Sequence, residues 1–356
     1  MQRRPPKDYS MTDDSADESD AGRRAPLTGR ELAKALGISQ STISRAFSEG
    51  ATISPKMRAK VLEAARELGY QPNVIARSLT TRRSGIVGIV TANMTNPFYV
   101  SILQPLARRL QQMGLQTLLF SVPSGQQIDS QLPLLLQYNV DAIVVMTGTI
   151  SAEMARRWAD AGRLVLPFSY TIPELDLPSV SCDNEAGGRA VAQHLVQMGH
   201  KRPAFVGGHP HSATSVARGR GFAQGLEELG VPLFGRLDTG EYTYEGGYAA
   251  ALELGRTRPD AIFFADDIMA LGGMDALRFG LGLSVPQDIS VVGFDNIPLA
   301  GWPTYELTTF AQPVEPMIEA AVRLLTRRDG EAVTAEHSAL LPGTLVQRKS
   351  VRARGR

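Results

Sequence analysis

From residue 86 onward the sequence alternates short β-branched runs with stretches of helical length, and this alternation limits the possible folds more than any other feature. The clearest runs are IVGIVTA (86–92), LQTLLFS (115–121) and DAIVVMTG (141–148), and others follow at 164–168, 203–208, 261–266 and 289–294. Strands that alternate with helices predict parallel sheets covered by helices. Roughly ten strands are more than one ordinary sheet holds. We therefore predict two lobes, with a ligand cleft at the carboxyl ends of their strands.

Composition and apolar runs narrow the class of protein. The 356 residues are 43% hydrophobic and 21% charged, as in ordinary globular proteins. The single cysteine, Cys182, excludes an internal disulfide framework and is typical of a reducing compartment. The longest apolar runs are too short to cross a bilayer, and the N-terminus has no apolar signal core. We expect a cytoplasmic protein.

The net charge of +1 is unevenly distributed. Residues 27–84 carry 10 basic and 4 acidic side chains, whereas residues 85–356 carry 22 and 26. Residues 1–26 carry 5 and 6, with almost nothing to bury, and are predicted to be a disordered tail. A basic module joined to a slightly acidic body indicates a polyanionic partner for the module. The alternative is a solvated face that happens to be basic.

Residues 27–70 have a helical pattern with clear helix boundaries. Thr28 and Glu31 predict a capping box that opens a helix ending at Gly37. Ser39 is expected to cap a second helix that ends near residue 47. The pair Ser54–Pro55 predicts the start of a third helix, which Gly69 terminates. Three short helices at this spacing predict a helix-turn-helix domain.

The second of these helices, within LGISQSTISRAF (36–47), is unusually rich in hydroxyl groups. Ser and Thr are poor residues for a helix interior because their hydroxyls compete for backbone groups. Leu32, Leu36, Ile38 and Ile43 are expected to face the core, which leaves the polar side chains outside. Hydroxyl and amide groups at a helix N-terminus suit phosphate oxygens, and Gln and Arg can read base edges. The arrangement predicts DNA binding, although any one of these residues alone is more often an ordinary surface side chain.

The headpiece segment LTGRELAKALGISQSTISRAFSEG, together with RRSGIVGIV, HLVQMGHKRPAFVGG, ADDIMALGGMDALR and ISVVGFDN, resembles the LacI/GalR family of bacterial transcriptional regulators. The resemblance covers roughly residues 27 to 347. It implies an all-α helix-turn-helix headpiece followed by a two-lobed α/β core like a type I periplasmic binding protein. It also implies a homodimer that binds a pseudo-palindromic operator, acts as a repressor and responds to a small-molecule effector.

The resemblance also implies which residues contact double-stranded DNA. Gln40 and Ser41 match the base-reading pair, and Arg45 matches the arginine of the recognition helix. The backbone-contacting or capping positions are Thr28, Ser39, Thr42, Ser44 and Asn73.

Residues 71–84 are expected to form a hinge and linker between the headpiece and the core. PNVIARSL (72–79) is too short for a helix that is stable alone in water. The resemblance implies a hinge helix that folds only when paired with its dimer mate over the minor groove. Leu79 then wedges between base pairs and Ala76 lies at the close contact. The alternative is a plain linker.

An effector site in the core, 85–347, follows from the same resemblance. The implied lining residues are Asn96, Phe98, Tyr170, Thr214, Arg218, Tyr242, Asp266, Asp295 and Gln312. Asp266 stands where many members have Asn, and PFSYT around Tyr170 lacks the charged residue often found there. A second carboxylate beside Asp295 disfavours an anionic ligand unless Arg218 compensates, so we expect a neutral hydroxylated compound, with a sugar acid still open.

Other classes of function have less support in the sequence. GRGFAQG (219–225) is glycine-rich but lies in a helical stretch, so it is not a dinucleotide fingerprint. His209 and His211 lack a third metal ligand in register. We expect no enzyme activity and no cofactor or metal. A transport binding protein needs export, and a regulator with a vestigial cleft stays an alternative.

The basic tail, 348–356, has no heptads. Operator, effector, mode of control and dimer versus tetramer stay open.

Overall fold

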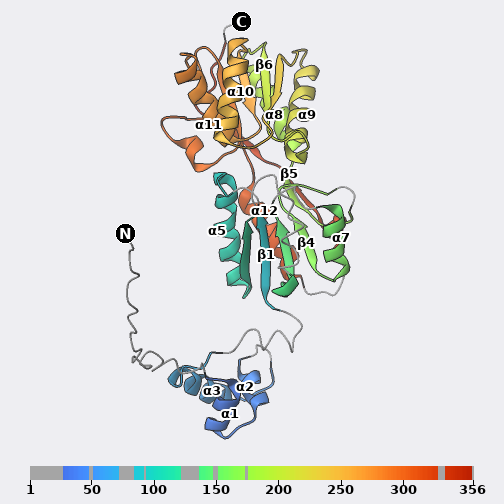
Figure 1. The fold of residues 1–356 in the computed structure, drawn as a ribbon, viewed down its shortest axis with the longest axis vertical. Coiled ribbons are helices and arrows are strands. Elements are labelled where there is room, and N and C mark those ends of the chain that lie inside the picture. Colours follow the sequence, from blue (N-terminus) through green and yellow to red (C-terminus); the bar gives the residue numbers. More distant parts are fainter. Residues whose placement is uncertain are drawn as a thin grey trace, which may run out of the picture. The chain divides into compact units, whose positions relative to one another are not determined.

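The computed structural model describes residues 27–47, 51–71, 84–91, 94–121, 136–146, 151–172, 175–327 and 333–354. The chain divides into two compact units, residues 1–81 and 82–356 (Figure 1). We call their described parts the headpiece and the core. The predicted tail, 1–26, and the predicted hinge residues Asn73, Ala76 and Leu79 lie outside the described residues.

The headpiece contains three helices, α1 (Gly29–Leu36), α2 (Gln40–Ala46) and α3 (Pro55–Glu67). The predicted capping box is present: the Glu31 amide donates to Thr28 Oγ1, and the Thr28 amide donates to Glu31 Oε2. Gly37 ends α1 with φ +67°, a conformation in which a side chain is strained. Ser39 and Ser54 cap α2 and α3, so the predicted helix starts are confirmed.

The headpiece core is small and apolar. It consists of Leu32, Ala33, Ile43, Ala46, Val61 and Ala65. Leu36 and Ile38 pack against it but are only partly buried. Because both buried residues of α2 lie on one side of that helix, its polar residues face away from the core.

The N-lobe of the core has a parallel sheet with the order β2-β1-β3-β4 among the described residues. Its strands are β1 (Ile86–Thr91), β2 (Gln116–Ser121), β3 (Ala142–Val145) and β4 (Leu164–Pro167). Helices α5 (Pro97–Gln112) and α7 (Ala152–Asp160) pack on it. The predicted strands of this lobe are confirmed.

The C-lobe has a sheet with the order β12-β10-β9-β8-β6-β7 among the described residues. Its parallel strands are β6 (Pro203–Gly207), β7 (Gly235–Asp238), β8 (Ala261–Phe264), β9 (Ser290–Asp295) and β10 (Thr308–Ala311), and β12 (Thr344–Val346) runs antiparallel to β10. The helices of this lobe are α8 (Asn184–Gln197), α9 (Ala213–Glu228), α10 (Tyr244–Arg256) and α11 (Asp267–Asp275). A π-helical turn, Ala276–Gly280, continues α11, and a 3-10 turn, Pro298–Gly301, follows β9.

The chain passes between the lobes more than once. After β10, helix α12 (Val314–Thr326) returns to the N-lobe and packs against α5 (Figure 1). A 3-10 turn, Ala335–His337, then leads into β11 (Ala339–Leu341), which pairs with β5 (Val180–Cys182). Strand β12 brings the chain back to the C-lobe. The two lobes are therefore covalently tied at several points, which limits how they move.

Helices α8 and α9 meet at backbone contact. A Cβ atom at Gly188 would lie 2.1 Å from the carbonyl oxygen of Arg218, and one at Gly221 would lie 2.0 Å from that of Glu185. Neither position accommodates even a methyl group without displacing a helix. The glycines of GRGFAQG thus serve helix packing inside α9, and they do not form a strand-to-helix turn.

Within the described parts of the chain, no helix combines the length and hydropathy that a bilayer-spanning segment requires.

Candidate functional site

One face of α2 is exposed and polar, and the core-facing residues Ile43 and Ala46 anchor it. The side chains of Ser39, Gln40, Ser41, Ser44 and Arg45 are exposed, and that of Thr42 is half-buried. This face holds the predicted base-reading pair on the first turn of the helix. It offers amide, hydroxyl and guanidinium groups, which suit base edges and phosphates.

The hydroxyl groups of this face are also bonded to one another. Ser39 Oγ accepts from the Thr42 amide and lies 2.8 Å from both Ser41 Oγ and Thr42 Oγ1. Arg45 folds back, with Nε donating to the Ser41 carbonyl at 3.3 Å. The serines therefore cap and order the helix start, while Gln40 extends from it.

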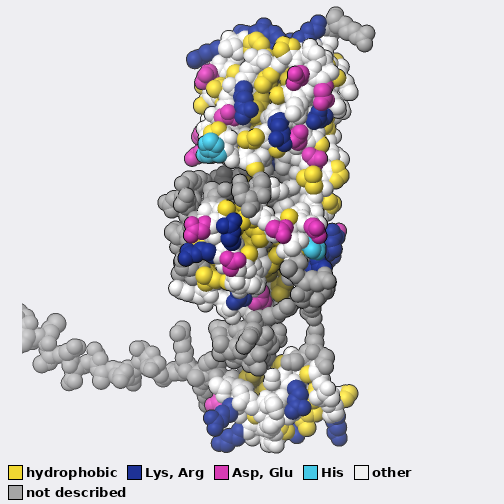
Figure 2. Space-filling model, turned by 90° about the vertical axis from the view of Figure 1, so that its right-hand side faces the viewer, with side chains coloured by type: hydrophobic (Ala, Val, Ile, Leu, Met, Phe, Trp, Pro, Cys, Tyr) yellow, Lys and Arg dark blue, Asp and Glu magenta, His cyan; other side chains and the backbone are white. Residues whose placement is uncertain are grey.

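Charge on the headpiece favours an anionic partner. Residues 27–47 and 51–71 carry seven basic and three acidic side chains. Lysine and arginine side chains are spread over the headpiece face that Figure 2 shows. These positive charges attract the negatively charged phosphate backbone of DNA whatever its base sequence.

The core contains a cleft at the carboxyl ends of its strands, as predicted for two α/β lobes. Asn96 and Phe98 come from the start of α5 in the N-lobe, and Asp266 follows β8 in the C-lobe. The described residues that line the cleft are Asn96, Phe98, Tyr99, Ser169, Thr214, Arg218, Tyr242, Asp266, Asp295 and Gln312. The fold thus gathers eight of the nine residues predicted for an effector site.

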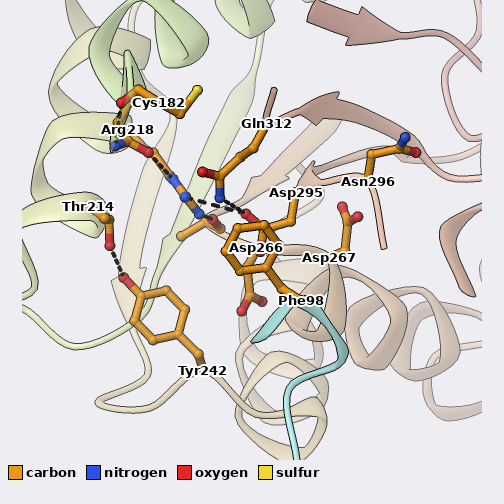
Figure 3. A network of polar contacts seen from close by, with 12 residues as sticks. Phe98, Cys182, Thr214, Arg218, Tyr242, Asp266, Asp267, Asp295, Asn296 and Gln312 are labelled. Carbon is orange, nitrogen blue, oxygen red and sulfur yellow. Dashed lines mark hydrogen bonds and ion pairs between the residues drawn. The ribbon is translucent and has the colours of Figure 1, made fainter. Parts of the chain in front are cut away.

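Arg218 is the centre of a buried network (Figure 3). Its Nε donates to Asn184 Oδ1 at 2.8 Å, and its NH1 donates to the Ala265 carbonyl at 2.6 Å. Its NH2 lies 3.4 Å from Asp295 Oδ1, which also accepts from Gln312 Nε2 at 2.7 Å. The arginine is therefore held in place by the protein before any ligand arrives.

Two carboxylates share this site with one guanidinium. Burial raises the pKa of Asp266 to about 7, and the neighbouring charge of Asp295 adds to that shift. Burial also raises the pKa of Asp295, to about 6, although Arg218 opposes the shift. A third carboxyl, Asp267, is buried too, but it accepts from Thr309 Oγ1 and the Ile297 amide. It belongs to the C-lobe scaffold.

Two residues of the cleft have strained backbones. Ser169 has φ +73° and Asp295 has φ +113°, in regions that side chains rarely adopt. Ser169 lies two residues after the end of β4, and Asp295 is the last residue of β9. Such strain persists where surrounding structure over-determines it, and it concentrates at binding sites.

Three hydroxyl groups, those of Ser212, Thr214 and Tyr242, are bonded to one another at the cleft. Tyr242 OH lies 3.1 Å from Thr214 Oγ1 and 2.8 Å from Ser212 Oγ, so the tyrosine ring is held from α9 (Figure 3). Burial raises the pKa of Tyr242, which keeps its phenol protonated as a neutral hydrogen-bonding group.

The free space inside the cleft is about 30 Å³. This is room for about two water molecules, against the several hundred Å³ of a usual ligand pocket. A larger groove of about 340 Å³ lies between α5 and α12, but its charged residues, among them Arg108 and Glu319, are exposed. We assign the ligand site to the smaller cleft because its polar groups are buried and converge.

Comparison with known proteins identifies the family. Residues 29–73 match the model for bacterial regulatory proteins of the lacI family, and residues 192–351 match the periplasmic binding protein-like domain. The HTH-type transcriptional regulator DegA of Bacillus subtilis is 32% identical over 326 residues, which are 90% of this chain and 96% of DegA. The chain belongs to the lacI family of bacterial regulatory proteins.

Further relatives of this lacI-family protein match along nearly its whole length. The ribose operon repressor of Escherichia coli (strain K12) is 29% identical over 91% of this chain and 99% of its own. The Lac repressor dimer bound to operator and the anti-inducer ONPF is 27% identical, with a TM-score of 0.81 over 92% of this chain and 100% of that one. The complex of the regulator CelR with cellobiose is 29% identical, with a TM-score of 0.68 over 91% and 99%. The predicted family and fold class are confirmed.

Two cleft residues of the lacI-family protein were not predicted, and one predicted residue lies elsewhere. Tyr99 and Ser169 line the cleft. Tyr170 does not line it, and packs in an apolar cluster of the N-lobe with Val145 and Val165. Ser169 was identifiable from the rule that ligands meet the first residues after a strand, because β4 ends at Pro167.

Proposed function

We propose that the protein is a sequence-specific, effector-controlled transcriptional repressor that acts in the cytoplasm and has no enzyme activity. The exposed polar face of α2 is the observation that carries this proposal, because it presents Gln40 and Arg45 from a helix whose other side is anchored in the headpiece core. The operator-bound Lac repressor dimer, with similar fold and chain length, supports it. The confirmed family sets the class of function, and the operator itself is left to experiment.

The proposed operator is pseudo-palindromic and is bound by a homodimer. Two headpieces related by a two-fold axis read two half-sites, so the symmetry of the protein appears in the DNA. Asn73, Ala76 and Leu79 are proposed to order as a hinge helix over the minor groove between the half-sites. In this arrangement the side chain of Leu79 inserts between the two central base pairs and kinks the DNA.

Selection of bound fragments from a random DNA pool tests the DNA-binding proposal. We expect a pseudo-palindrome with a central CG step, bound less tightly as salt concentration rises. An asymmetric site, or equal binding by an R45A variant, contradicts the proposed mode of recognition. The control E63A removes an exposed side chain of α3, outside the α2 face.

The proposed effector is a neutral polyhydroxylated compound such as a sugar. Arg218 already donates two hydrogen bonds within the protein, to Asn184 and to the Ala265 carbonyl, and its NH2 nitrogen faces Asp295 at 3.4 Å. The carboxyl groups of Asp266 and Asp295 therefore repel an anionic ligand more than the remaining N–H groups of Arg218 attract it. Ser169 Oγ and Gln312 Oε1 are buried without a hydrogen-bond partner among the described residues, and hydroxyl groups of a sugar supply partners for both.

A thermal-shift screen of sugars and sugar acids separates this proposal from a vestigial cleft. A compound that binds the native state raises the melting temperature in proportion to the logarithm of its concentration. We expect neutral sugars to give such a rise and matched sugar acids to give a smaller one. A screen without any rise contradicts the effector role and leaves DNA binding standing.

A further inference from the structure

One hydrogen bond joins the two walls of the cleft directly. Asn96 Nδ2 donates to Asp266 Oδ2 at 2.9 Å, and the two residues are 170 positions apart in the sequence. Asn96 belongs to the N-lobe and Asp266 to the C-lobe. Both side chains are almost completely buried, at 4% and 1% exposure.

Each of these two residues is also the N-cap of a helix. Asn96 Oδ1 accepts from the Phe98 amide at the start of α5, at 3.0 Å. Asp266 Oδ1 accepts from the Met269 amide at the start of α11, also at 3.0 Å. One atom of each side chain is therefore committed to its own helix, and the other points across the cleft.

These caps fix the direction of the bond. Because Oδ1 of Asn96 is used by its cap, only the NH₂ group is available to the other lobe. Residue 266 must then supply an acceptor while its first oxygen also accepts from the Met269 amide. A carboxylate does both, whereas an asparagine with the same cap presents a second NH₂ group, so that two donors face each other.

We propose that the Asn96–Asp266 hydrogen bond holds the lobes together in the absence of a ligand, and that a ligand enters by placing a hydroxyl group between the two side chains. A hydroxyl group accepts from Asn96 and donates to Asp266 at once. An ammonium group has no acceptor and a carboxylate has no donor, so either leaves one buried group unpaired. The second clause rests on the effector role proposed above, and the first does not.

Exchanging the two side chains tests the first clause in the ligand-free, full-length protein. The variants are compared at pH 8, where Asp266 is ionised. N96D then keeps the cap of α5 but sets two carboxylates face to face, and D266N keeps the cap of α11 but sets two donors face to face. The double variant N96D/D266N restores one donor and one acceptor with the direction reversed. D183N is the matched control, because Asp183 caps α8 in the same way through the Ala186 amide.

The measurement is hydrogen–deuterium exchange at the first turns of α5 and α11. We expect each single variant to accelerate exchange about tenfold in both helices, including the helix that carries no substitution. The double variant should recover most of the protection, and D183N should change neither helix. Acceleration confined to the substituted helix, or a double variant that exchanges as fast as the single ones, overturns the proposal. If a single variant does not fold, the double variant decides between these outcomes.

The second clause is tested with matched probes: D-ribose and cellobiose, their aldonates, and amino sugars of the same ring size. In thermal-shift titrations the neutral sugars should raise the melting temperature of the wild type. The apparent affinity obtained from the same titration of D266N should be at least tenfold lower. Binding restricted to the aldonates or amino sugars overturns the proposal that a ligand hydroxyl group lies between Asn96 and Asp266. No response from any probe overturns the clause together with the effector role, while the exchange data still decide the bond between the lobes.

Discussion

The guanidinium of Arg218 lies over the ring of Phe294, with its Cζ atom 3.7 Å from the ring centroid. Stacking of a buried arginine on an aromatic face adds a cation–π attraction to its hydrogen bonds. The residue after Phe294 in the chain is Asp295, which the same guanidinium approaches at its other end. Strand β9 thus holds both the apolar and the ionic partner of the arginine.

Removal of Arg218 should strongly destabilise the core. R218A leaves the carboxylate of Asp295 buried without its ionic partner, and loss of one partner of a buried pair costs about 3–5 kcal/mol. Arg220 provides the control, since it pairs with Glu185 but is exposed, and exposed pairs contribute about 1 kcal/mol or less. Urea unfolding measures both. An R218A variant no less stable than R220A contradicts the role of this network.

Asp266 should make stability depend on pH in a defined direction. Its pKa is raised in the folded protein from 3.8 to about 7, so its contribution is fully present below pH 4 and is lost as the pH rises through 7. Asn96 donates a hydrogen bond to it, and the titratable or charged groups that interact with it include Asp295, Arg218, Asp267, Tyr99 and Tyr242. The D266N variant lacks this loss, so its free energy of unfolding relative to wild type should increase from pH 5 to pH 7, by at most about 1.4 kcal/mol per pH unit.

Urea unfolding at pH 5, 6, 7 and 8 checks this prediction. D183N serves as the control, because it removes a carboxyl at another helix N-cap. A constant difference between D266N and wild type across this range would show that Asp266 does not titrate there.

Gln40 should affect operator binding without affecting headpiece stability. Its side chain is exposed at the first turn of α2, so Q40A removes no packing. Loss of a bidentate contact to a base edge costs about 1–3 kcal/mol of discrimination. Fluorescence anisotropy with the selected operator and with a scrambled site measures the difference. Equal loss on both sequences would indicate a phosphate contact in place of base reading.

Leu79 should separate operator binding from effector binding. The L79A variant removes the proposed wedge, so operator affinity should fall while the effector-induced thermal shift is nearly unchanged. L229A is a suitable control, since Leu229 is an exposed leucine of the C-lobe. Operator affinities equal to wild type would count against a wedge at Leu79.

Local signals in the sequence predicted the helix starts and the long buried strands. Thr28, Ser39 and Ser54 cap helices by contacts within three residues, so their role is written in adjacent sequence. Strands β5, β7, β10, β11 and β12 were not among the predicted runs. Strands β5 and β11 have three residues each, and their pairing joins segments far apart in the chain, which no local periodicity shows.

The candidate site was predicted less fully than the fold. The residues at strand ends came from the family pattern, but a step of one residue after β4 separates Ser169 in the cleft from Tyr170 in the apolar cluster. The bond between Asn96 and Asp266 depends on the distance between two lobes. Sequence supplies the two side chains and their caps, and only the assembled core brings them within reach.

The backbone contact between Gly188 and Arg218 has a consequence for how this cleft varies. The carbonyl of residue 218 rests where a side chain at 188 would begin, so helix α8 acts as a spacer that sets the height of the arginine above β9. A methyl group at 188 would collide with this carbonyl, so a G188A variant should displace α9 and, with it, the guanidinium stacked on Phe294. Gly188 does not line the cleft, and the absence of a side chain there nevertheless helps to set where Arg218 lies within it.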